Sequence, residues 1–478
     1  MKNKAFISTA IPYVNGDPHI GHSLEYVQTD VMARYLRIKY GNDNVYALTG
    51  SDENALKNVL AAEIAGKTTI DFIDEKTAEF KKLYETLNLS FHDFIRTTEE
   101  RHIKGAQKLW SMFKKEDVYQ DTYAGMYCVG CEEFKTEKDL EDGLCPEHKK
   151  KPELVSENNY FFKLSNYQKQ IEKLIKEDVI KIVPEKRKNE VLGFVKEGLK
   201  DFSISRSTAR ARNWGVPVPN DNGQVMYVWV DALSNYITAL DFANEGELYN
   251  KFWDNDEVER IHVIGKGIVK FHALYWIGML LSAEVPLPTI EFVHGYVTVE
   301  GNKIGKSLGN AIHPDEVIKK YGIDAFRYYL LKEIPAYGDG DFAYSRMDEI
   351  YKSDLQNGLG NLVSRVAAMA EKSEITNPKF SNSQMTTEVT EALNNFKFDS
   401  AMTIIWARIK KADQFVSEKR VWELKDKERE EALTWLVTEI RQIATDLAPF
   451  LPESAQKIAE IYNKEKIVKG EGLFPRLV

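Results

Sequence analysis

The chain has 478 residues, of which 43% are hydrophobic and 29% are charged, and its formal net charge is −9. This composition is typical of a soluble globular protein of about two to four domains, and it excludes a protein that coats nucleic acid through bulk positive charge. Three cysteines are too few for a disulfide scaffold in a chain of this length. The longest apolar run, 273–281, is about half of the ~20 residues that a membrane span needs, so we expect a cytoplasmic protein.

The first predicted strand and helix are joined by a turn that contains two histidines. Phe6, Ile7, Ala10 and Ile11 are apolar enough for a buried strand, and apolar residues recur at helical spacing over 24–38. His19, Gly21 and His22 fall where the strand gives way to the helix. The N-terminus of a helix offers unpaired N–H groups, and a glycine lets a ligand approach the backbone. The sequence therefore predicts a phosphate-binding turn.

A second strand is predicted over 45–49, and acidic residues including Asp52 follow it directly. Open α/β sheets bind ligands at the rim where their strands end, so Asp52 is a candidate ligand-binding residue. The alternative is that Asp52 caps the helix predicted over 54–66. Further helices are predicted over 72–89 and 101–116.

All three cysteines occur in one pattern with a histidine. Cys128 and Cys131 form one pair, and Cys145 and His148 form a second pair with the same spacing. Two such pairs can supply the four soft ligands of a tetrahedral zinc ion, and we expect a structural site because no fifth donor is apparent. The alternative is three unpaired cysteines and a surface histidine.

Strand and helix patterns alternate again after the cysteine segment. Strands are predicted over 225–231, 261–265 and 292–296, with helical patterns after the first two. This alternation on both sides of the cysteine segment indicates one parallel sheet that an insertion interrupts.

Two segments carry clustered basic residues. Lys303 and Lys306 lie in a polar loop that contains glycine, and such a loop can close on a phosphate chain, although it is more often simply exposed. The run 186–214 is rich in lysine and arginine. It forms either a solvated face or a phosphate or nucleic-acid contact.

From about residue 348 the strand patterns cease. Residues 355–370, 402–415 and 432–447 show apolar residues at helical spacing, which predicts a helical bundle. The predicted fold is thus α/β, with a Rossmann-like parallel-sheet catalytic domain, a zinc-knuckle insertion and an all-α domain. The predicted boundaries are 1–116 and 225–325 for the catalytic domain, 117–224 for the insertion, 326–347 for a connecting segment and 348–478 for the bundle.

These motifs together resemble the class I aminoacyl-tRNA synthetases, and among them the methionyl-tRNA synthetase family in its single-zinc form. The resemblance rests on 10–16 leading into His19-Ile20-Gly21-His22, on 227–233, on 293–296 leading into Lys303-Ile304-Gly305-Lys306-Ser307, and on 321–327. It covers essentially the whole chain. No further C-terminal dimerisation module is expected, which predicts a monomer.

The resemblance implies that methionine and ATP react to form methionyl-adenylate and pyrophosphate, and that the methionyl group then passes to tRNA. It implies that His19, His22, Lys303 and Lys306 are catalytic, with a magnesium ion. The implied ATP-binding residues are His19, Gly21, His22, Gly265, Lys303, Lys306 and Ser307. The implied methionine-binding residues are Ile11, Tyr13, Asp52, Trp229, Ala232, Leu233, Tyr236, Ile268 and His272. The implied anticodon-binding residues are Asn361, Arg365 and Trp422.

The chain departs from the family pattern at a few positions. Asn54 stands where the family has a histidine, Gly267 where it has an aspartate, and Gly305 where it has a serine. These departures keep open a weakened paralogue that binds tRNA without charging it. Two further alternatives are a sibling synthetase for isoleucine, valine, leucine or cysteine, and a small nucleotidylyltransferase. The branched-chain siblings carry a longer insertion, and a nucleotidylyltransferase has no use for a helical anticodon domain.

Overall fold

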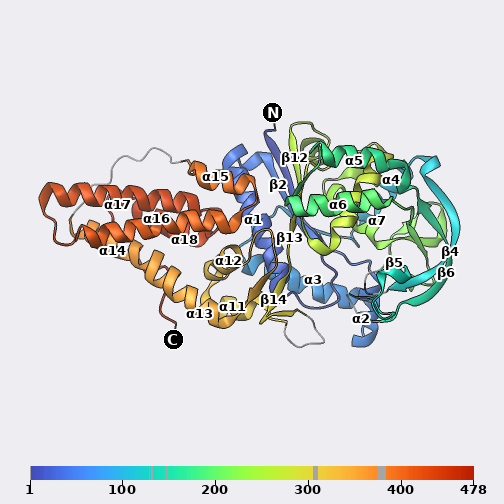
Figure 1. Cartoon of the computed structure of the whole chain (residues 1–478), viewed down its shortest axis with the longest axis horizontal. Helices are drawn as coiled ribbons and strands as arrows, with labels where there is room; N and C mark the ends of the chain where they lie inside the picture. The colour runs from blue at the N-terminus through green and yellow to red at the C-terminus, as the bar shows by residue number, and fades with distance from the viewer. Residues whose placement is uncertain are drawn as a thin grey trace. The chain divides into compact units, whose positions relative to one another are not determined.

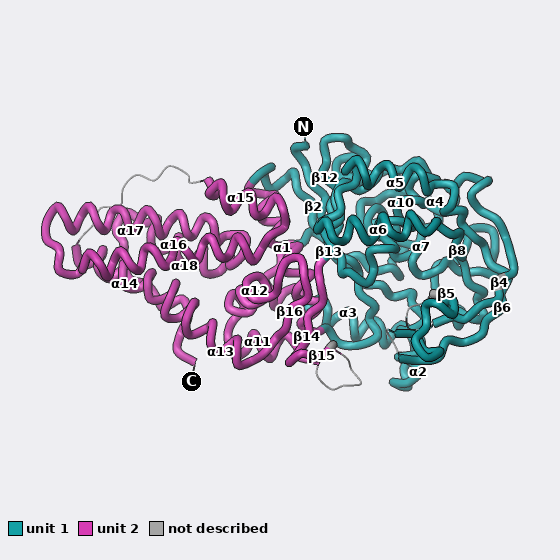
Figure 2. Tube along the Cα trace, viewed as in Figure 1, with its two compact units in different colours: residues 1–18, 39–82, 91–293 teal, residues 19–38, 83–90, 294–478 magenta. Residues whose placement is uncertain are grey.

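The computed structural model describes residues 2–128, 130, 133–146, 149–304, 311–373 and 384–477; of Lys303 only the backbone is described. The chain forms two compact units (Figure 2). Unit 1 comprises residues 1–18, 39–82 and 91–293, and unit 2 comprises residues 19–38, 83–90 and 294–478.

The centre of unit 1 is a six-stranded sheet with the strand order β3-β2-β1-β12-β13-β7. The bounds of its strands are β1 (Lys4–Thr9), β2 (Val45–Ser51), β3 (Asp93–Arg96), β7 (Lys181–Val183), β12 (Val258–Gly265) and β13 (Ile290–His294). The pairings of β1 with β2 and β12, of β2 with β3 and of β13 with β7 are all parallel. All residues of β2 are buried, which explains why its sequence reads as a continuous apolar run.

The pairing of β1 with β12 joins the two halves of the sheet across the insertion. Their register runs from Lys4 opposite Val258 to Thr9 opposite Val263, and Ser8 Oγ lies 2.8 Å from His262 Nδ1. The predicted interrupted parallel sheet and the α/β fold class are therefore confirmed. Helices of unit 1 are α2 (Leu56–Ala65), α3 (Thr69–Thr86), α4 (Glu100–Met112), α5 (Gln168–Lys176), α6 (Glu185–Glu197), α7 (Val228–Leu233), α8 (Asn235–Thr238), α9 (Glu247–Phe252) and α10 (Ile277–Ala283).

Two smaller sheets lie within the stretch between β3 and β12. One has the order β5-β4-β6-β8, and its main element is the antiparallel pair β4 and β6, which runs from Val118 opposite Phe162 to Tyr127 opposite Glu153. The other has the order β10-β11-β9. The strand bounds are β4 (Val118–Cys128), β5 (Glu133–Lys135), β6 (Glu153–Phe162), β8 (Phe202–Ser203), β9 (Ser205–Ser207), β10 (Pro217–Val218) and β11 (Asp221–Met226).

The strand predicted over 225–231 is wrong. The chain leaves β11 at Met226 and turns into α7, where Val230 N and Asp231 N donate to Tyr227 O at 2.8 and 3.1 Å. Most of the helix is buried, so it carries apolar β-branched residues on several sides and shows no helical periodicity. A short apolar run cannot be assigned to strand or helix by its pattern alone.

Unit 2 contains the helix that follows the histidine turn and the predicted bundle. Figure 1 shows the long helices α16 and α17 running alongside one another near α18. The predicted all-α C-terminal domain is thus present. Its elements and their neighbours are α1 (Ile20–Tyr40), β14 (Val297–Val299), β15 (Asn302–Lys303), α11 (Pro314–Tyr321), α12 (Ile323–Lys332), β16 (Gly340–Phe342), α13 (Tyr344–Ile350), α14 (Asn361–Lys372), α15 (Thr387–Asn394), α16 (Phe398–Glu418), α17 (Asp426–Leu447) and α18 (Pro452–Tyr462).

A buried ion pair joins α1 to the helical part of unit 2. Arg327 on α12 donates to Asp30 Oδ2 at 2.7 Å, and both side chains are fully buried. Burial alone would raise the pKa of Asp30, but Arg327 and Arg34 outweigh burial and hold that pKa below its usual value. Arg327 Nε also donates to the carbonyl of Phe450 at 2.8 Å. One guanidinium therefore fastens α1 to the segment between α17 and α18.

No helix of the described chain is both long enough and apolar enough to cross a membrane.

Glu291 on β13 carries a buried carboxyl group with an unusual titration. Its side chain is fully buried, and neither carboxyl oxygen has a hydrogen-bond partner among the described residues. Burial raises the pKa of Glu291 from 4.5 to about 8. Below pH 4.5 both the folded and the unfolded states hold the proton, but between pH 4.5 and 8 only the folded state does, so stability falls as the pH rises.

We expect Glu291→Gln to be more stable than the wild type at pH 7.5 by about 2–3 kcal/mol, because an amide need not hold a proton to stay neutral. The difference in free energy of unfolding between the variant and the wild type should nearly vanish at pH 5. Urea unfolding at both pH values measures it, with the exposed strand residue Glu153→Gln as the control. A gap of equal size at both pH values would contradict the assignment.

Candidate active site

Asp52 lies directly after β2, at the edge of the sheet where the parallel strands end. Its N–H donates to Pro12 O at 2.9 Å, and it forms a bridge with Tyr13. Its side chain is only 3% exposed. The residue that caps α2 is Ala55, so Asp52 does not act as the cap. The structure thus brings Asp52 and Tyr13 together and leaves the carboxylate of Asp52 without a capping role.

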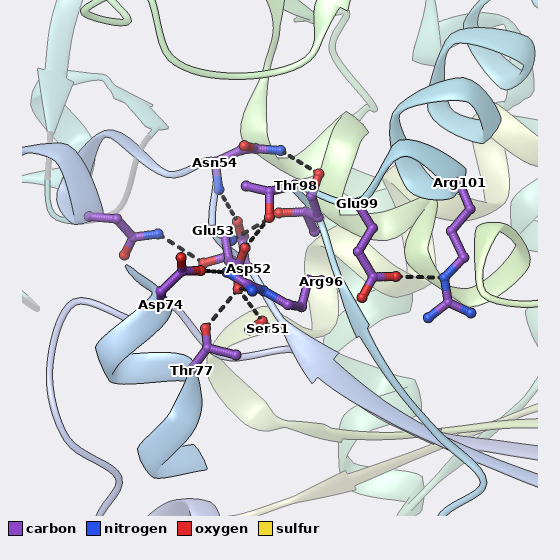
Figure 3. Close-up of polar contacts among 12 residues, drawn as sticks. Ser51, Asp52, Glu53, Asn54, Asp74, Thr77, Arg96, Thr98, Glu99 and Arg101 are labelled. Atoms are coloured by element: carbon purple, nitrogen blue, oxygen red, sulfur yellow. Dashed lines mark hydrogen bonds and ion pairs between the residues drawn. The ribbon is translucent and has the colours of Figure 1, made fainter. Parts of the chain in front are cut away.

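Glu53, next in the chain, anchors this segment (Figure 3). Its fully buried carboxylate accepts hydrogen bonds from Ser51 Oγ at 2.8 Å, Thr77 Oγ1 at 2.7 Å and Arg96 Nε at 2.7 Å, and also from Thr98 Oγ1. A buried carboxylate with four donors has little freedom to move. The backbone that carries Asp52 is therefore held in one conformation.

The predicted methionine side-chain residues gather around α7. Trp229, Ala232 and Leu233 lie on this helix. The ring of Trp229 stacks on Phe271 with 3.8 Å between ring centroids, and it meets the ring of His272 edge-on at 6.3 Å. These contacts form an aromatic wall.

His272 is held between two partners. Its Nδ1 lies 3.0 Å from Ile268 O, which can only accept, so Nδ1 carries the proton and Nε2 accepts from the Tyr236 hydroxyl at 2.7 Å. Burial lowers the pKa of His272 to about 4, and the bond to Ile268 offsets only part of that effect. The imidazole is neutral near pH 7. This part of unit 1 therefore offers an apolar ligand aromatic surfaces and no charge.

The remaining predicted residues of unit 1 lie around the same hydrophobic core. Leu233 and Tyr236 belong to this core, and Ile11, Tyr13, Trp229 and Ile268 pack against it while staying partly exposed. Gly265 is the last residue of β12 and precedes the short helical turn Lys266–Ile268. The structure thus groups the predicted amino-acid residues within one unit.

The two predicted catalytic histidines lie together in unit 2. The rings of His19 and His22 stack with 3.9 Å between centroids, and His19 N donates to His22 Nδ1 at 3.1 Å. Gly21 lies between them, and a Cβ added there would come within 3.0 Å of the His19 ring. Any larger residue at position 21 would therefore displace His19.

The chain enters and leaves the predicted lysine loop beside this histidine turn. Ile20 N donates to Ile312 O at 3.3 Å, and Ile304 Cδ1 would lie 3.9 Å from a Cβ on Gly21. Lys306 and Ser307 lie outside the described residues, as does the side chain of Lys303. Ile312, which follows the loop, is therefore hydrogen-bonded to the histidine turn.

The predicted anticodon residues gather at the bundle. The guanidinium of Arg365 lies over the ring of Trp422, 4.8 Å from its centroid, and Trp422 is 43% exposed. Asn361 is exposed on α14, one helical turn before Arg365, so the two share a face. The alternative of a tryptophan in the bundle core is therefore excluded for Trp422.

Two of the four predicted zinc ligands are described. Cys128 is the last residue of β4, and its thiol and that of Cys145 are both buried. Cys145 N donates to Lys150 O at 2.9 Å. Cys131 and His148 lie outside the described residues, and no group of three or more potential metal ligands is found within the described ranges. The zinc site stays a prediction.

Comparison with known proteins identifies the family. Residues 5–151 and 137–367 match the family model described as tRNA synthetases class I (M). The chain is 40% identical over 514 residues to a methionine–tRNA ligase of Clostridium acetobutylicum, covering 100% of this chain and 78% of that protein. It is 38% identical over 481 residues to the enzyme of Brucella suis, covering 96% of this chain and 92% of that protein. This chain belongs to the class I tRNA synthetases of the methionine type.

The match extends to three-dimensional structure. The crystal structure of Mycobacterium tuberculosis methionyl-tRNA synthetase bound by methionyl-adenylate is 33% identical, with a TM-score of 0.90, and covers 99% of this chain and 100% of that chain. The predicted family and fold class are confirmed. The family motifs therefore occupy a methionyl-tRNA synthetase scaffold.

Sequence reasoning missed several residues of this synthetase site. Phe271, which stacks on Trp229, lies between the predicted residues Ile268 and His272 but was not itself among the predicted residues. Asp231 and His102 are fully buried and form a hydrogen-bonded pair, with 2.5 Å between Asp231 Oδ1 and His102 Nε2. They are far apart in sequence, so no local pattern could have paired them.

Proposed function

We propose that this class I synthetase activates L-methionine with ATP to form methionyl-adenylate and pyrophosphate, and then transfers the methionyl group to tRNA(Met). The family membership supports the reaction. The observation that carries the proposal is the hydrogen bond from Ile20 N to Ile312 O at 3.3 Å, which joins the histidine turn to the chain that follows the lysine loop. In the sequence Ile312 closely follows the two lysines, and Ile20 lies between the two histidines; a lysine and the N-terminus of a helix each favour binding to phosphate.

In the first step a carboxylate oxygen of methionine attacks the α-phosphorus of ATP, and pyrophosphate leaves. In the second step a hydroxyl of the terminal adenosine of tRNA attacks the carbonyl carbon of the adenylate, and AMP leaves. The reactants supply both nucleophiles, so the protein contributes positioning and charge stabilisation. We assign His19 and His22 to the ATP phosphates, and Lys303 and Lys306 to the departing pyrophosphate. Gly21, Gly265 and Ser307 complete the proposed ATP site.

For methionine we propose that Asp52 binds the ammonium group and that the surfaces around α7 take the side chain. The support is chemical. A buried carboxylate is the partner that an ammonium group requires, and the stacked Trp229 and Phe271 offer the aromatic contacts that a thioether favours, at ~0.3–1.5 kcal/mol each. The neutral His272 adds no charge to this pocket.

Two metal ions belong to the proposal. Cys128, Cys131, Cys145 and His148 would hold a structural zinc ion, and the burial of the thiols of Cys128 and Cys145 suits a closed site with soft ligands. A magnesium ion would accompany the ATP phosphates and neutralise part of their charge.

For tRNA we propose that Asn361, Arg365 and Trp422 bind the anticodon. The exposed Trp422 ring can stack on an unpaired base, and Arg365, which lies over that ring, can reach the edge of a base or a phosphate.

The first test is methionine-dependent exchange between ATP and pyrophosphate. We expect exchange with the wild type, and we expect His22→Ala to lower its rate by a factor of about 10²–10³, since one donor to a developing charge is worth ~3–4 kcal/mol. Methionine binding, measured by calorimetry, should change little and serves as the internal control.

Exchange that depends on a different amino acid would indicate a sibling synthetase, and no exchange with any amino acid would favour the tRNA-binding paralogue. A His22→Ala variant that loses methionine binding but keeps its maximal rate would refute the assigned role of His22.

Trp422→Ala tests the anticodon site. Because stacking on one base is worth ~1–3 kcal/mol, kcat/KM for tRNA(Met) should fall by about five- to 150-fold, while ATP–pyrophosphate exchange stays at the wild-type rate. Trp422→Phe keeps an aromatic surface and should retain most of the aminoacylation activity. Equal aminoacylation by Trp422→Ala and the wild type would remove Trp422 from the site.

A further inference from the structure

Asn54 connects the segment after β2, which carries Asp52, to the helix α7, which carries Asp231. Its side-chain Nδ2 donates to Asp231 Oδ2 at 2.8 Å and to Thr97 O at 3.0 Å. Its backbone N–H donates to Asp52 Oδ1 at 3.3 Å. One residue therefore contacts both the proposed ammonium partner Asp52 and the carboxylate of Asp231.

Asp231 lies on α7, the helix that carries Trp229, Ala232 and Leu233. Its carboxylate is fully buried, and its second oxygen lies 2.5 Å from His102 Nε2. One oxygen is bound by an amide and the other lies beside an imidazole, so hydrogen bonds at both oxygens fix the orientation of this carboxylate. The segment after β2 and the helix α7 are thus connected by directional hydrogen bonds.

His102 is itself fixed in place. It is fully buried on α4, and its Nδ1 lies 2.9 Å from Thr238 Oγ1 on α8. The two helices approach closely at Gly105, where a Cβ would come within 2.4 Å of the Thr238 side chain. Both ring nitrogens of the buried His102 therefore have a partner, Thr238 on one side and Asp231 on the other.

Buried charged and polar groups of this kind contribute little net stability compared with apolar residues of the same shape. What they supply is geometry, because hydrogen bonds fix distance and direction while apolar contacts tolerate sliding. An amino acid bound with its ammonium group at Asp52 and its side chain against Trp229 spans the two connected parts. The distance between these parts limits the length of side chain that fits.

We infer that Asp231, held by His102 and bonded to Asn54, is a positioning residue that sets the spacing between Asp52 and α7 and so selects the length of the amino-acid side chain. This inference rests on the proposed function. It also accounts for Asn54, where the family motif has a histidine, because an amide and an imidazole can both donate an N–H to Asp231.

The test compares methionine with ethionine, whose side chain is one methylene longer. The quantity measured is the ratio of kcat/KM for the two amino acids in ATP–pyrophosphate exchange, which does not depend on how much of a variant is folded. One methylene is commonly worth about 10–200-fold in discrimination. We expect the ratio to fall by about fivefold or more in Asn54→Ala and in Asp231→Asn, with KM for ATP unchanged.

Two further variants serve as controls. Asn54→His keeps a donor toward Asp231 and should retain most of the wild-type ratio. Thr289→Val removes the hydrogen bonds to the backbone N–H and carbonyl of Arg260, near the start of β12 and outside the Asp52 segment and α7, so it should lower stability without altering the ratio.

A ratio that stays at the wild-type value in both Asn54→Ala and Asp231→Asn would overturn the inference and leave these residues a purely structural role. A ratio that falls equally in Thr289→Val would overturn it as well, because a general loosening of unit 1 would then explain the loss of discrimination. A wild type without methionine-dependent exchange would refute the proposed function itself, and the inference with it.

Discussion

The parallel pairing of β1 with β12 is the constraint on which unit 1 depends. Its two strands are separated by about half of the chain, and the register places Ser8 opposite His262. Bringing together such distant strands costs chain entropy. The burial of both strands within a six-stranded sheet offsets this entropy cost. Without this pairing, residues from the two halves of the chain would not meet.

The consequence of the pairing is a site built from strand ends. The segment after β1 carries Tyr13, the segment after β2 carries Asp52, and the segment after β12 leads to Ile268 and His272. Carboxyl ends of parallel strands lie at one edge of a sheet, where α/β proteins bind their ligands. Polar groups hold the Asp52 segment, whereas neutral aromatic groups line the α7 region. An amino acid with an uncharged side chain fits this arrangement, because its ammonium group can meet Asp52 while its side chain meets the neutral aromatic groups.

Much of the architecture could be predicted from the sequence because its strands are buried and its helices are amphipathic. The interrupted sheet followed from alternating strand and helix patterns, and the bundle from helical spacing after residue 348. The error at 225–231 arose because α7 is a short, buried helix with apolar residues on most sides. Burial on several sides removes the periodicity by which a helix is recognised.

The candidate site was predicted only in part. Residues in motifs, such as His19, Asp52 and Trp229, could be named from the resemblance to the family. The partners that hold these residues could not be named, because Asp231 meets His102 and Asn54 only after folding. The fully buried His102 stands alone in the sequence, and a lone histidine predicts nothing about its partner. The residues proposed to contact the substrate could therefore be predicted from the sequence, but the residues that position them could not.

The most direct test of this account is a calorimetric titration with methionine and with 4-(methylthio)butanoate, which lacks the amino group. If Asp52 binds the ammonium group, the wild type should prefer methionine by about 10–100-fold, the value of a hydrogen bond to a charged group. In Asp52→Asn most of that preference should disappear while the affinity for the analogue stays the same. An equal preference in the wild type and in Asp52→Asn would contradict the assignment of the amino-acid site.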